Sequence, residues 1–411
     1  MPYETLEKIS YRQPGQYESI YETRFNDPET VHLDFEVNDY PAFIVQNGDV
    51  YRVLLQIQKT DKHVQLLCRD LPGAALGQFA QKCLVDEIVL TNDIEGVNST
   101  RREISEVLEQ IGSKSGRHRF YGLVRKYLML QEQEERKIKT CQDVRNIYND
   151  LVLKEVVEEN SKDAPDGVIF RKDSVSVSNS AQKEIHRGLY PENKIIEAMD
   201  HALAFLNSDI CDPLVRISAF HYLVGYIHPF YNGNGRLSRF ISSYLLSDEL
   251  NFLIGYRLSY TVKDNIKQYY DSFKTCNNPR NRGDLTPFVL SFLDIIQKAM
   301  NQLEAALLRR KADYDKYMKM IPLHSFAVKE KDQELLGYLT QASLFSGHGI
   351  PTKTLQEMLG ISYTPLKNRL AALRQMHLLC EEKIGREKFY RLDLAELERQ
   401  IEAQTDISAT Q

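Results

Sequence analysis

A segment of twelve residues, HPFYNGNGRLSR from His228 to Arg239, brings together residue types that handle phosphate. Pro229 disfavours helical backbone at the residue before it. We therefore expect the helix that begins at Pro213 to end at His228 and to leave the imidazole at its C-terminal end. An imidazole titrates near neutral pH, so it can act there as a general base.

The second half of this segment has the composition of an anion site. Gly233 and Gly235 permit a tight loop whose backbone N–H groups point into one concavity, and an amphipathic helix follows over residues 236–250. Unpaired N–H groups and the helix dipole both favour negative charge there. Arg236 and Arg239 lie three residues apart on that helix and share one face. A base, an anion cradle and two cations together predict a phosphate-transfer site.

Taken singly, these features have ordinary structural explanations. A histidine before proline is most often structural, a Gly-Asn-Gly sequence is most often a turn, and two arginines at this spacing most often lie on a solvated face. The prediction depends on all of them occurring within one short segment.

Helical periodicity dominates the chain from about residue 76 to 330, and these helices must position the segment. Asp212 before Pro213 is a strong helix start, because an N-cap acceptor precedes a proline whose missing N–H has no partner to lose. Residues 51–67 hold two short apolar runs around a polar turn, which predicts a hairpin or two helix ends. Residues 87–108 are expected to be helical.

One stretch interrupts the helical pattern. VIFRKDSVSV, from Val168 to Val177, places β-forming residues on either side of Lys172-Asp173 and follows a Pro-Asp-Gly turn. This pattern predicts a small hairpin. Its exposed edge could accept an extended peptide by strand addition, and the alternative is a structural flap without a partner.

After Pro322 the pattern changes. Helical stretches over 331–345, 351–359 and 364–376 precede two strand-like runs around Gly385, which predicts a winged helix-turn-helix. Residues 347–392 carry eight Lys or Arg and four Asp or Glu, so this module could contact DNA, dock a protein partner or dimerise. The basic residues on its third helix and hairpin are Lys367, Arg369, Arg374, Lys383, Arg386, Lys388 and Arg391.

Length and composition set the broader class. A chain of 411 residues predicts two to three domains. Its formal charge of −5 argues against a protein that coats nucleic acid. Six scattered cysteines without a C-x-x-C pair indicate reduced thiols, not disulfides or a zinc site. Neither a secretory leader nor a membrane-spanning run is evident. We therefore expect a cytoplasmic protein without membrane contact.

The segment that begins at His228 resembles the signature of Fic-domain proteins, H-P-F-x-[D/E]-G-N-G-R-x-x-R. Tyr269-Tyr270 and GDLTPF at 283–288 are similar to the family's downstream Y-Y and G-D-x-x-P-[FW] segments. The likeness covers about residues 85–298. The fold that the resemblance implies is mainly α: a Fic-type helical core with a small β-hairpin flap, plus a C-terminal winged helix-turn-helix domain. The expected domains are an N-terminal extension over 1–84, a catalytic core over 85–325 and a winged helix over 326–411.

The resemblance implies adenylylation, the transfer of AMP from ATP to a Ser, Thr or Tyr hydroxyl of a target protein. His228 would be the general base, and Arg236 would share the catalytic role by stabilising charge as pyrophosphate leaves. The implied ATP- and phosphate-binding residues are Gly233, Asn234, Gly235, Arg236 and Arg239. The implied adenine pocket is Tyr270 and Asn277. The hairpin residues Val168, Ile169, Phe170 and Val175 would form the flap that aligns the target.

Asn232 departs from the family pattern, which has Asp or Glu at this position to hold Mg²⁺ between the α- and β-phosphates. Mg²⁺ prefers charged oxygen ligands, yet it is often held mainly by substrate phosphates and water. We therefore expect Asn232 to be a weak metal ligand, with slower or more conditional catalysis.

Residues 91–96, TNDIEG, resemble the family's inhibitory motif, [S/T]-x-x-x-E-[G/N]. A glutamate that reaches Arg239 would form a bidentate ion pair and occupy the cation meant for the γ-phosphate. The chain would then be repressed by its own Glu95 until that residue moves, and the alternative is an ordinary surface glutamate.

Two other functions stay open at this point. The same site could work as a de-adenylylating hydrolase, with Glu95 positioning water. Alternatively, the chain could be a winged-helix transcriptional regulator with weakened catalysis. The target protein, the modified residue type, the signal that relieves inhibition and the oligomeric state, including a homodimer, are not encoded in any motif.

Overall fold

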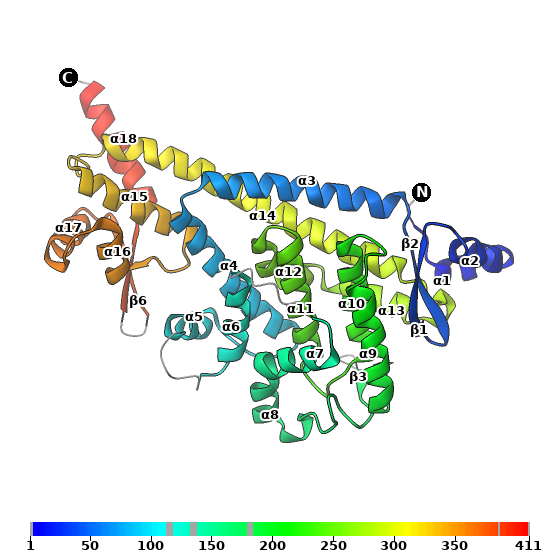
Figure 1. Cartoon of the computed structure of the whole chain (residues 1–411). Coiled ribbons are helices and arrows are strands. Elements are labelled where there is room, and N and C mark those ends of the chain that lie inside the picture. The colour runs from blue at the N-terminus through cyan, green and yellow to red at the C-terminus, as the bar shows by residue number, and fades with distance from the viewer. Residues whose placement is uncertain (1–2, 112–117, 132–137, 179–183, 385–386, 410–411) are drawn as a thin grey trace. The chain divides into compact units, whose positions relative to one another are not determined.

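The computed structural model describes residues 3–111, 118–131, 138–178, 184–384 and 387–409, and it is mainly helical (Figure 1). This confirms the predicted fold class. The chain divides by packing into two units, one formed by 1–62 and 86–301 and the other by 63–85 and 302–411. The division into 1–84, 85–325 and 326–411 stays a prediction. In the described ranges, no helix is both long and apolar enough to span a membrane.

The first unit is mostly helical, with two small hairpins. Its N-terminal part comprises α1 (Leu6–Arg12), α2 (Tyr17–Phe25), β1 (Thr30–Val37), β2 (Tyr40–Val45), α5 (Arg101–Gln110), α6 (Tyr121–Leu128), α7 (Cys141–Tyr148), the π-helix η3 (Asn149–Leu153) and α8 (Lys154–Glu159). Its central part comprises β3 (Ser176–Ser178), β4 (Glu184–Arg187), α9 (Glu192–Leu206), α10 (Pro213–Ile227), α11 (Asn234–Glu249), α12 (Leu258–Asp264) and α13 (Ile266–Cys276). Three long helices, α3 (Gly48–Asp70), α4 (Gly73–Ile94) and α14 (Thr286–Met320), contribute residues to both units.

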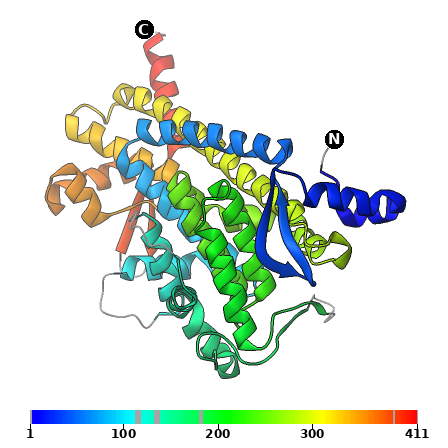
Figure 2. The same ribbon diagram turned by 45° about the vertical axis from the view of Figure 1, so that its right-hand side comes forward.

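Helix α10 is the centre of the first unit. It packs against α9 on one side and α11 on another, and the β1–β2 hairpin lies beside α9 (Figure 2). Twelve of its fifteen residues are buried, so it has no solvated stripe. A helix that is apolar all round must be enclosed by other elements. Its end is therefore a fixed point against which the loop after it can be built.

Two expectations about helices were wrong. Residues 51–67 do not divide into two elements, because α3 is continuous through them. The buried side chains of Val50, Leu54, Ile57 and Val64 keep a spacing of three, four or seven residues, so one apolar stripe continues through the polar stretch. Residues 87–108, in contrast, are divided between α4 and α5. Gly96, with φ of 73°, allows the chain to turn between them.

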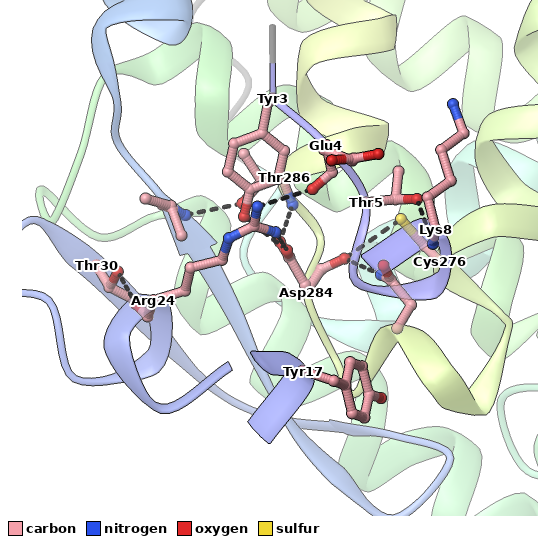
Figure 3. A network of polar contacts seen from close by, with 12 residues as sticks. Tyr3, Glu4, Thr5, Lys8, Tyr17, Arg24, Thr30, Cys276, Asp284 and Thr286 are labelled. Atoms are coloured by element: carbon pink, nitrogen blue, oxygen red, sulfur yellow. Dashed lines mark hydrogen bonds and ion pairs between the residues drawn. The ribbon is translucent and has the colours of Figure 1, made fainter. Parts of the chain in front are cut away.

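The N-terminal segment is fastened to the core through the buried carboxylate of Asp284 (Figure 3). The Tyr3 hydroxyl donates to its Oδ2 at 2.6 Å, and the Arg24 guanidinium lies 3.5 Å from the same oxygen. The N–H of Thr286 donates to Oδ1 at 3.0 Å. Backbone bonds between Phe43 and residues 283 and 285 extend the attachment. Burial raises the pKa of Asp284 because it disfavours the charged carboxylate. The hydrogen bonds from Tyr3 and Thr286 and the charge of Arg24 oppose this effect and stabilise the carboxylate.

The second unit ends in a compact module. It comprises α15 (Glu330–Phe345), β5 (Ile350–Pro351), α16 (Thr352–Leu359), α17 (Tyr363–Gln375), β6 (Leu379–Ile384), β7 (Glu387–Leu392) and α18 (Leu394–Ala409). The strands form one antiparallel sheet in the order β5-β7-β6. Three helices followed by a hairpin were expected here, and the assignment as a winged helix stays a prediction.

Several basic residues of this module are neutralised within it. Arg369 pairs with Asp332 at 2.7 Å, and Glu381 is paired with both Arg374 and Lys388. Arg386 lies outside the described residues. These ion pairs lower the positive charge that α17 and the hairpin can offer to a phosphate backbone, because each acid offsets a base. Contact with DNA therefore stays a prediction that the local charges do not favour.

We expect Tyr3→Phe to lower the free energy of unfolding by about 2 kcal/mol, because a buried carboxylate oxygen loses a short hydrogen bond. Urea denaturation followed by circular dichroism measures this change. Tyr11→Phe is the matched control, since the Tyr11 ring is 64% exposed and its hydroxyl accepts a hydrogen bond from the surface residue Arg280. Equal losses in the two variants would contradict this account of the Asp284 network.

Candidate active site at the start of helix α11

The loop between α10 and α11 begins at a left-handed residue. Helix α10 starts at Pro213 behind the N-cap Asp212 and ends at Ile227, as predicted. His228 then adopts φ 52° and ψ 63°, and its N–H donates to the Val224 carbonyl at 3.0 Å. A left-handed conformation is unfavourable for a residue with a Cβ atom, so the surrounding structure must hold it.

The loop is closed by its own side chains. The Asn234 amide accepts from the Phe230 N–H at 3.0 Å and donates to the Phe230 carbonyl at 2.7 Å. Gly233, with φ of 80°, precedes the first turn of α11. The Asn232 side-chain oxygen accepts from the Gly233 N–H at 2.7 Å. Asn234 therefore shapes the loop with its side chain, and only its backbone N–H is left for an anion at the helix start.

Aromatic packing fixes the loop against the rest of the first unit. The Phe230 ring is fully buried and stacks on Tyr148, with ring centroids 3.6 Å apart and planes at 8°. Phe170 meets Phe230 edge to face at 5.5 Å. The Tyr148 hydroxyl also donates to the Asn232 carbonyl at 3.1 Å. One tyrosine thus holds the loop by both its ring and its hydroxyl.

Arg239 is buried and bound by α4 and the turn that follows it. Its Nε donates to the Thr91 hydroxyl at 2.9 Å, Nη2 to the Thr91 carbonyl at 3.0 Å and Nη1 to Glu95 Oε1 at 2.9 Å. Burial alone lowers the pKa of Arg239, but the Glu95 carboxylate and two nearby tyrosines outweigh it and raise that pKa. Thr91 had been noted only as the first residue of the inhibitory motif, and here it makes two of the three contacts.

The Glu95 carboxylate also lies against the start of α11. A methyl group placed on Gly235 would collide with it, so the carboxylate occupies the space directly beside the first turn of the helix. The Glu95 side chain is 23% exposed, whereas that of Arg239 is 1% exposed. An anionic group therefore already sits at the helix N-terminus, where the N–H groups and the dipole favour it.

Arg236 has a different acidic neighbour. Its guanidinium is fully buried and lies 3.8 Å from Glu155 Oε2, on α8. None of its three nitrogens has a hydrogen-bond partner among the described residues. Burial raises the pKa of Glu155 to about 7, against the opposing effect of Arg236. In the structure each of the two arginines faces its own carboxylate, and their action on the phosphates of ATP stays a prediction.

The imidazole of His228 is held in its neutral form. Burial, with the nearby charges of His186 and Arg171, lowers the pKa of His228 to about 3, while a hydrogen bond to the Gly225 backbone opposes them. A neutral imidazole can accept a proton at physiological pH. A general base needs this protonation state, but a pKa of about 3 makes His228 a weaker base than the near-neutral imidazole expected from the sequence.

The two residues expected in the adenine pocket lie in different surroundings. Tyr270, on α13, is 47% exposed and lies close enough to Glu95 and Arg239 for their charges to affect its pKa. Asn277 caps the end of α13, and its side-chain oxygen accepts from the Tyr222 hydroxyl at 2.7 Å. Tyr270 thus lies near the Glu95–Arg239 ion pair, whereas the Asn277 oxygen is already bonded to α10. Their binding of adenine stays a prediction.

The hairpin expected over Val168 to Val177 was placed too early in the chain. The strands that pair are β3, over residues 176–178, and β4, over residues 184–187. At 168–170 the backbone N–H groups instead donate to the Glu192 carboxylate, at 3.0, 2.8 and 2.9 Å. A carboxylate that takes three consecutive N–H groups leaves no donor for strand pairing. Val168, Ile169 and Phe170 therefore form no strand edge for a target.

The remaining flap residues take separate positions. Val168 is exposed and Phe170 is buried against Phe230, while the Val175 carbonyl accepts from the Gly188 N–H at 3.1 Å. Val175 thus lies at the edge of the true hairpin. Glu192 was missed because an acid in the first turn of a helix is an ordinary sequence feature.

Nothing in the site resembles a preformed metal centre. Among the described residues, no group of three or more His, Cys, Asp or Glu side chains could hold a metal ion. Asn232 offers a neutral carbonyl oxygen that already accepts one hydrogen bond. This donor suits Mg²⁺ only as a minor ligand to an ion carried mainly by substrate phosphates.

Comparison with known proteins gives a consistent match. Residues 140–246 match the model of the Fic/DOC family. Protein adenylyltransferase Fic of Drosophila mojavensis is 29% identical over 163 residues, which are 38% of this chain and 30% of that protein. Its counterpart in Drosophila grimshawi is 27% identical over 267 residues, 63% of this chain and 50% of that protein. The chain thus spans at most about half the length of these relatives.

A solved structure shows the same fold. The crystal structure of a Fic family protein from Desulfovibrio desulfuricans superposes with a TM-score of 0.50 at 19% identity, over 85% of this chain and 97% of that one.

Removing the ring that fixes the loop should destabilise the first unit. We expect Phe230→Ala to cost about 3–5 kcal/mol of unfolding free energy, because a fully buried ring and its stack on Tyr148 are lost. Thermal and urea denaturation measure this cost. Tyr270→Ala, at a half-exposed ring, is expected to cost less than about 1 kcal/mol. A loss for Phe230→Ala no larger than this would show that the loop does not depend on the stack.

Proposed function

This chain is a Fic-domain protein, and on that premise we propose that it is a protein adenylyltransferase that transfers AMP from ATP to a hydroxyl of a target protein. The observation that carries the proposal is the neutral imidazole of His228 in the same short loop as the N-terminus of α11. The imidazole supplies a base, and the N-terminus of α11 supplies N–H groups and a helix dipole that favour phosphate.

In the proposed reaction, His228 takes the proton of a Ser, Thr or Tyr hydroxyl as its oxygen attacks the α-phosphorus of ATP. A new O–P bond forms to the target, the bond between the α-phosphorus and the bridging oxygen to the β-phosphate breaks, and pyrophosphate leaves. The backbone of residues 233–235 would cradle the α- and β-phosphates. Arg239, released from Glu95, would hold the γ-phosphate.

Arg236 takes a more limited part in this proposal than Arg239. Because it is fully buried opposite Glu155, its charge is partly met within the protein. It would stabilise the leaving pyrophosphate through the field of its charge, which acts strongly at short range in a buried site. Magnesium, when bound with ATP, supplies charge neutralisation on the phosphates, and Asn232 would contact it weakly.

We propose that the resting enzyme is repressed by Glu95. Its carboxylate engages the guanidinium meant for the γ-phosphate and lies beside Gly235, where the phosphates would enter. Two anions cannot share this space, since like charges at contact distance repel strongly in a buried site. ATP could bind productively only after Glu95 has moved. A cytoplasmic location and a homodimer stay predictions.

The first test is Glu95→Gly, which removes the competing carboxylate. We expect auto-modification with radiolabelled ATP to rise on the order of tenfold to a hundredfold, the usual range of a coupling between two contacts. Adding His228→Ala to this variant should abolish the label. The assay is gel autoradiography of the full chain with Mg²⁺ and cell lysate.

Asp93→Gly is the matched control for this test. Asp93 lies two residues earlier, in the last turn of α4, and pairs with Lys263 at the surface, so its replacement also introduces a glycine near the helix end without touching Arg239. No gain from Glu95→Gly over Asp93→Gly would remove the repression hypothesis. Loss of label from modified protein on addition of the wild-type chain would instead favour a hydrolase.

A second test concerns the metal. Asn232→Asp restores a charged oxygen ligand, and the new carboxylate can still accept from the Gly233 N–H as Asn232 does. We expect it to lower the Mg²⁺ concentration that gives half-maximal AMP transfer by roughly tenfold, because affinity for a hard cation rises with ligand charge. Transfer is measured in the Glu95→Gly background over a series of Mg²⁺ concentrations. Unchanged or reduced transfer at low Mg²⁺ would sink this hypothesis.

A further inference from the structure

Arg171 is a fully buried cation that the proposed reaction does not use. Its Nε donates to the His228 carbonyl at 3.0 Å and its Nη2 to the Leu189 carbonyl at 2.8 Å, and Nη1 donates to the Asp173 carbonyl. None of the ion pairs found among the described residues includes Arg171. Its charge is therefore met by backbone carbonyl oxygens.

These three carbonyls belong to segments that meet beside His228, the proposed general base. Asp173 precedes β3, Leu189 follows β4, and His228 is the end of α10. Backbone bonds run beside the guanidinium: the Arg171 N–H donates to the Pro229 carbonyl at 3.3 Å, and the Leu189 N–H donates to the Ile227 carbonyl at 3.1 Å. The guanidinium thus joins both ends of the β3–β4 hairpin to the catalytic loop.

The packing around this junction leaves no room for adjustment. A Cβ atom on Gly188 would lie 2.5 Å from Arg171 Nη2 and 2.9 Å from the Cβ of His228. His228 itself is left-handed, so its carbonyl points where a helical residue's would not. A charged donor bonded to that carbonyl favours this one conformation over the alternatives.

Other ionisable side chains near His228 are already engaged. His186, on β4, has a ring nitrogen 2.6 Å from the Tyr226 carbonyl. The carboxylates of Asp166 and Glu192 accept from backbone N–H groups of residues 168–170 and 172. Arg171 and His186 therefore supply the positive charge nearest the imidazole, with no carboxylate bonded to either ring nitrogen in the described part of the chain.

We propose that Arg171 is a positioning residue for His228: its guanidinium holds the His228 carbonyl, keeps the ring in place and ties it to the β3–β4 hairpin. The structural part of this proposal stands on the contacts alone. Its consequence for catalysis rests on the proposed AMP transfer. The hairpin and the base would then move together, so that a target held by the hairpin meets a correctly aimed imidazole.

The first experiment needs no substrate. The full chain is labelled with ¹⁵N at its ten histidines, the His228 signals are assigned by their loss in His228→Ala, and the ring is titrated by NMR. We expect Arg171→Met to raise the pKa of His228 by about 1, a tenfold gain in proton affinity, because a nearby cation has been removed. Lys194→Met, which removes an exposed cation on α9, should leave that pKa unchanged.

The second experiment separates geometry from charge. Arg171→Lys keeps the positive charge, but a single ammonium group cannot reach three carbonyls as the planar guanidinium does. In the Glu95→Gly background we expect kcat for AMP transfer to fall at least tenfold, with KM for ATP within about twofold of the parent, since no ATP-binding group is altered. The pKa of His228 should stay low in this variant.

The outcomes are distinct. An unchanged pKa of His228 in Arg171→Met, or an unchanged kcat in Arg171→Lys, overturns the positioning role. If Arg171→Met does not fold, Gly188→Ala, which crowds both Arg171 and His228, is titrated in its place, and an unaltered His228 titration there also overturns the proposal. If the Glu95→Gly parent itself transfers no AMP, the proposed function fails, while the NMR titration still decides the role of Arg171.

Discussion

Three buried arginines surround one short loop, and the structure depends on how each of them is satisfied. Arg171, Arg236 and Arg239 are the largest fully buried side chains of the described chain. A buried cation needs acceptors, because desolvation without them is far more costly than any single contact is favourable. Backbone carbonyls accept from Arg171, and α4 with its following turn accepts from Arg239. Arg236 has no hydrogen-bond acceptor among the described residues and is met only by the charge of Glu155 at 3.8 Å. The groups that face these buried cations come from segments far apart in the sequence, so the buried charges bring those segments together around the loop.

The three arrangements differ in how easily they can be exchanged. The carbonyl oxygens that accept from Arg171 belong to the backbone of three segments, so they are less free to move away than a side chain is. Glu95 is a side chain at the end of a helix, 23% exposed, and a phosphate could take its place on Arg239. The loop is thus rigid on the side of His228 and exchangeable on the side of Arg239. This division suits a site in which the base must be preorganised and the nucleotide must be admitted under control.

Local rules predicted the parts of this site that depend on neighbouring residues. The stop of α10 at His228, the glycine turn and the start of α11 all follow from Pro229, Gly233 and the periodicity after them. The predicted position of the hairpin was wrong because the Glu192 carboxylate binds the N–H groups of residues 168–170. Local β-propensity carries no information about this contact. The prediction of two elements over residues 51–67 was wrong, because a continuous stripe of buried apolar side chains keeps α3 helical through a polar run that resembles a turn.

The sequence by itself determined the helical class, the shape of the loop, and the motifs that align the chain with Fic-domain proteins. Such features arise from steric limits and capping, which act within a few residues. Only the tertiary structure decided which groups meet the buried charges. Arg239 and Thr91 are 148 residues apart, and Arg171 and His228 are 57 apart. No local preference selects such partners, because they are chosen by what the packed interior brings within hydrogen-bonding distance.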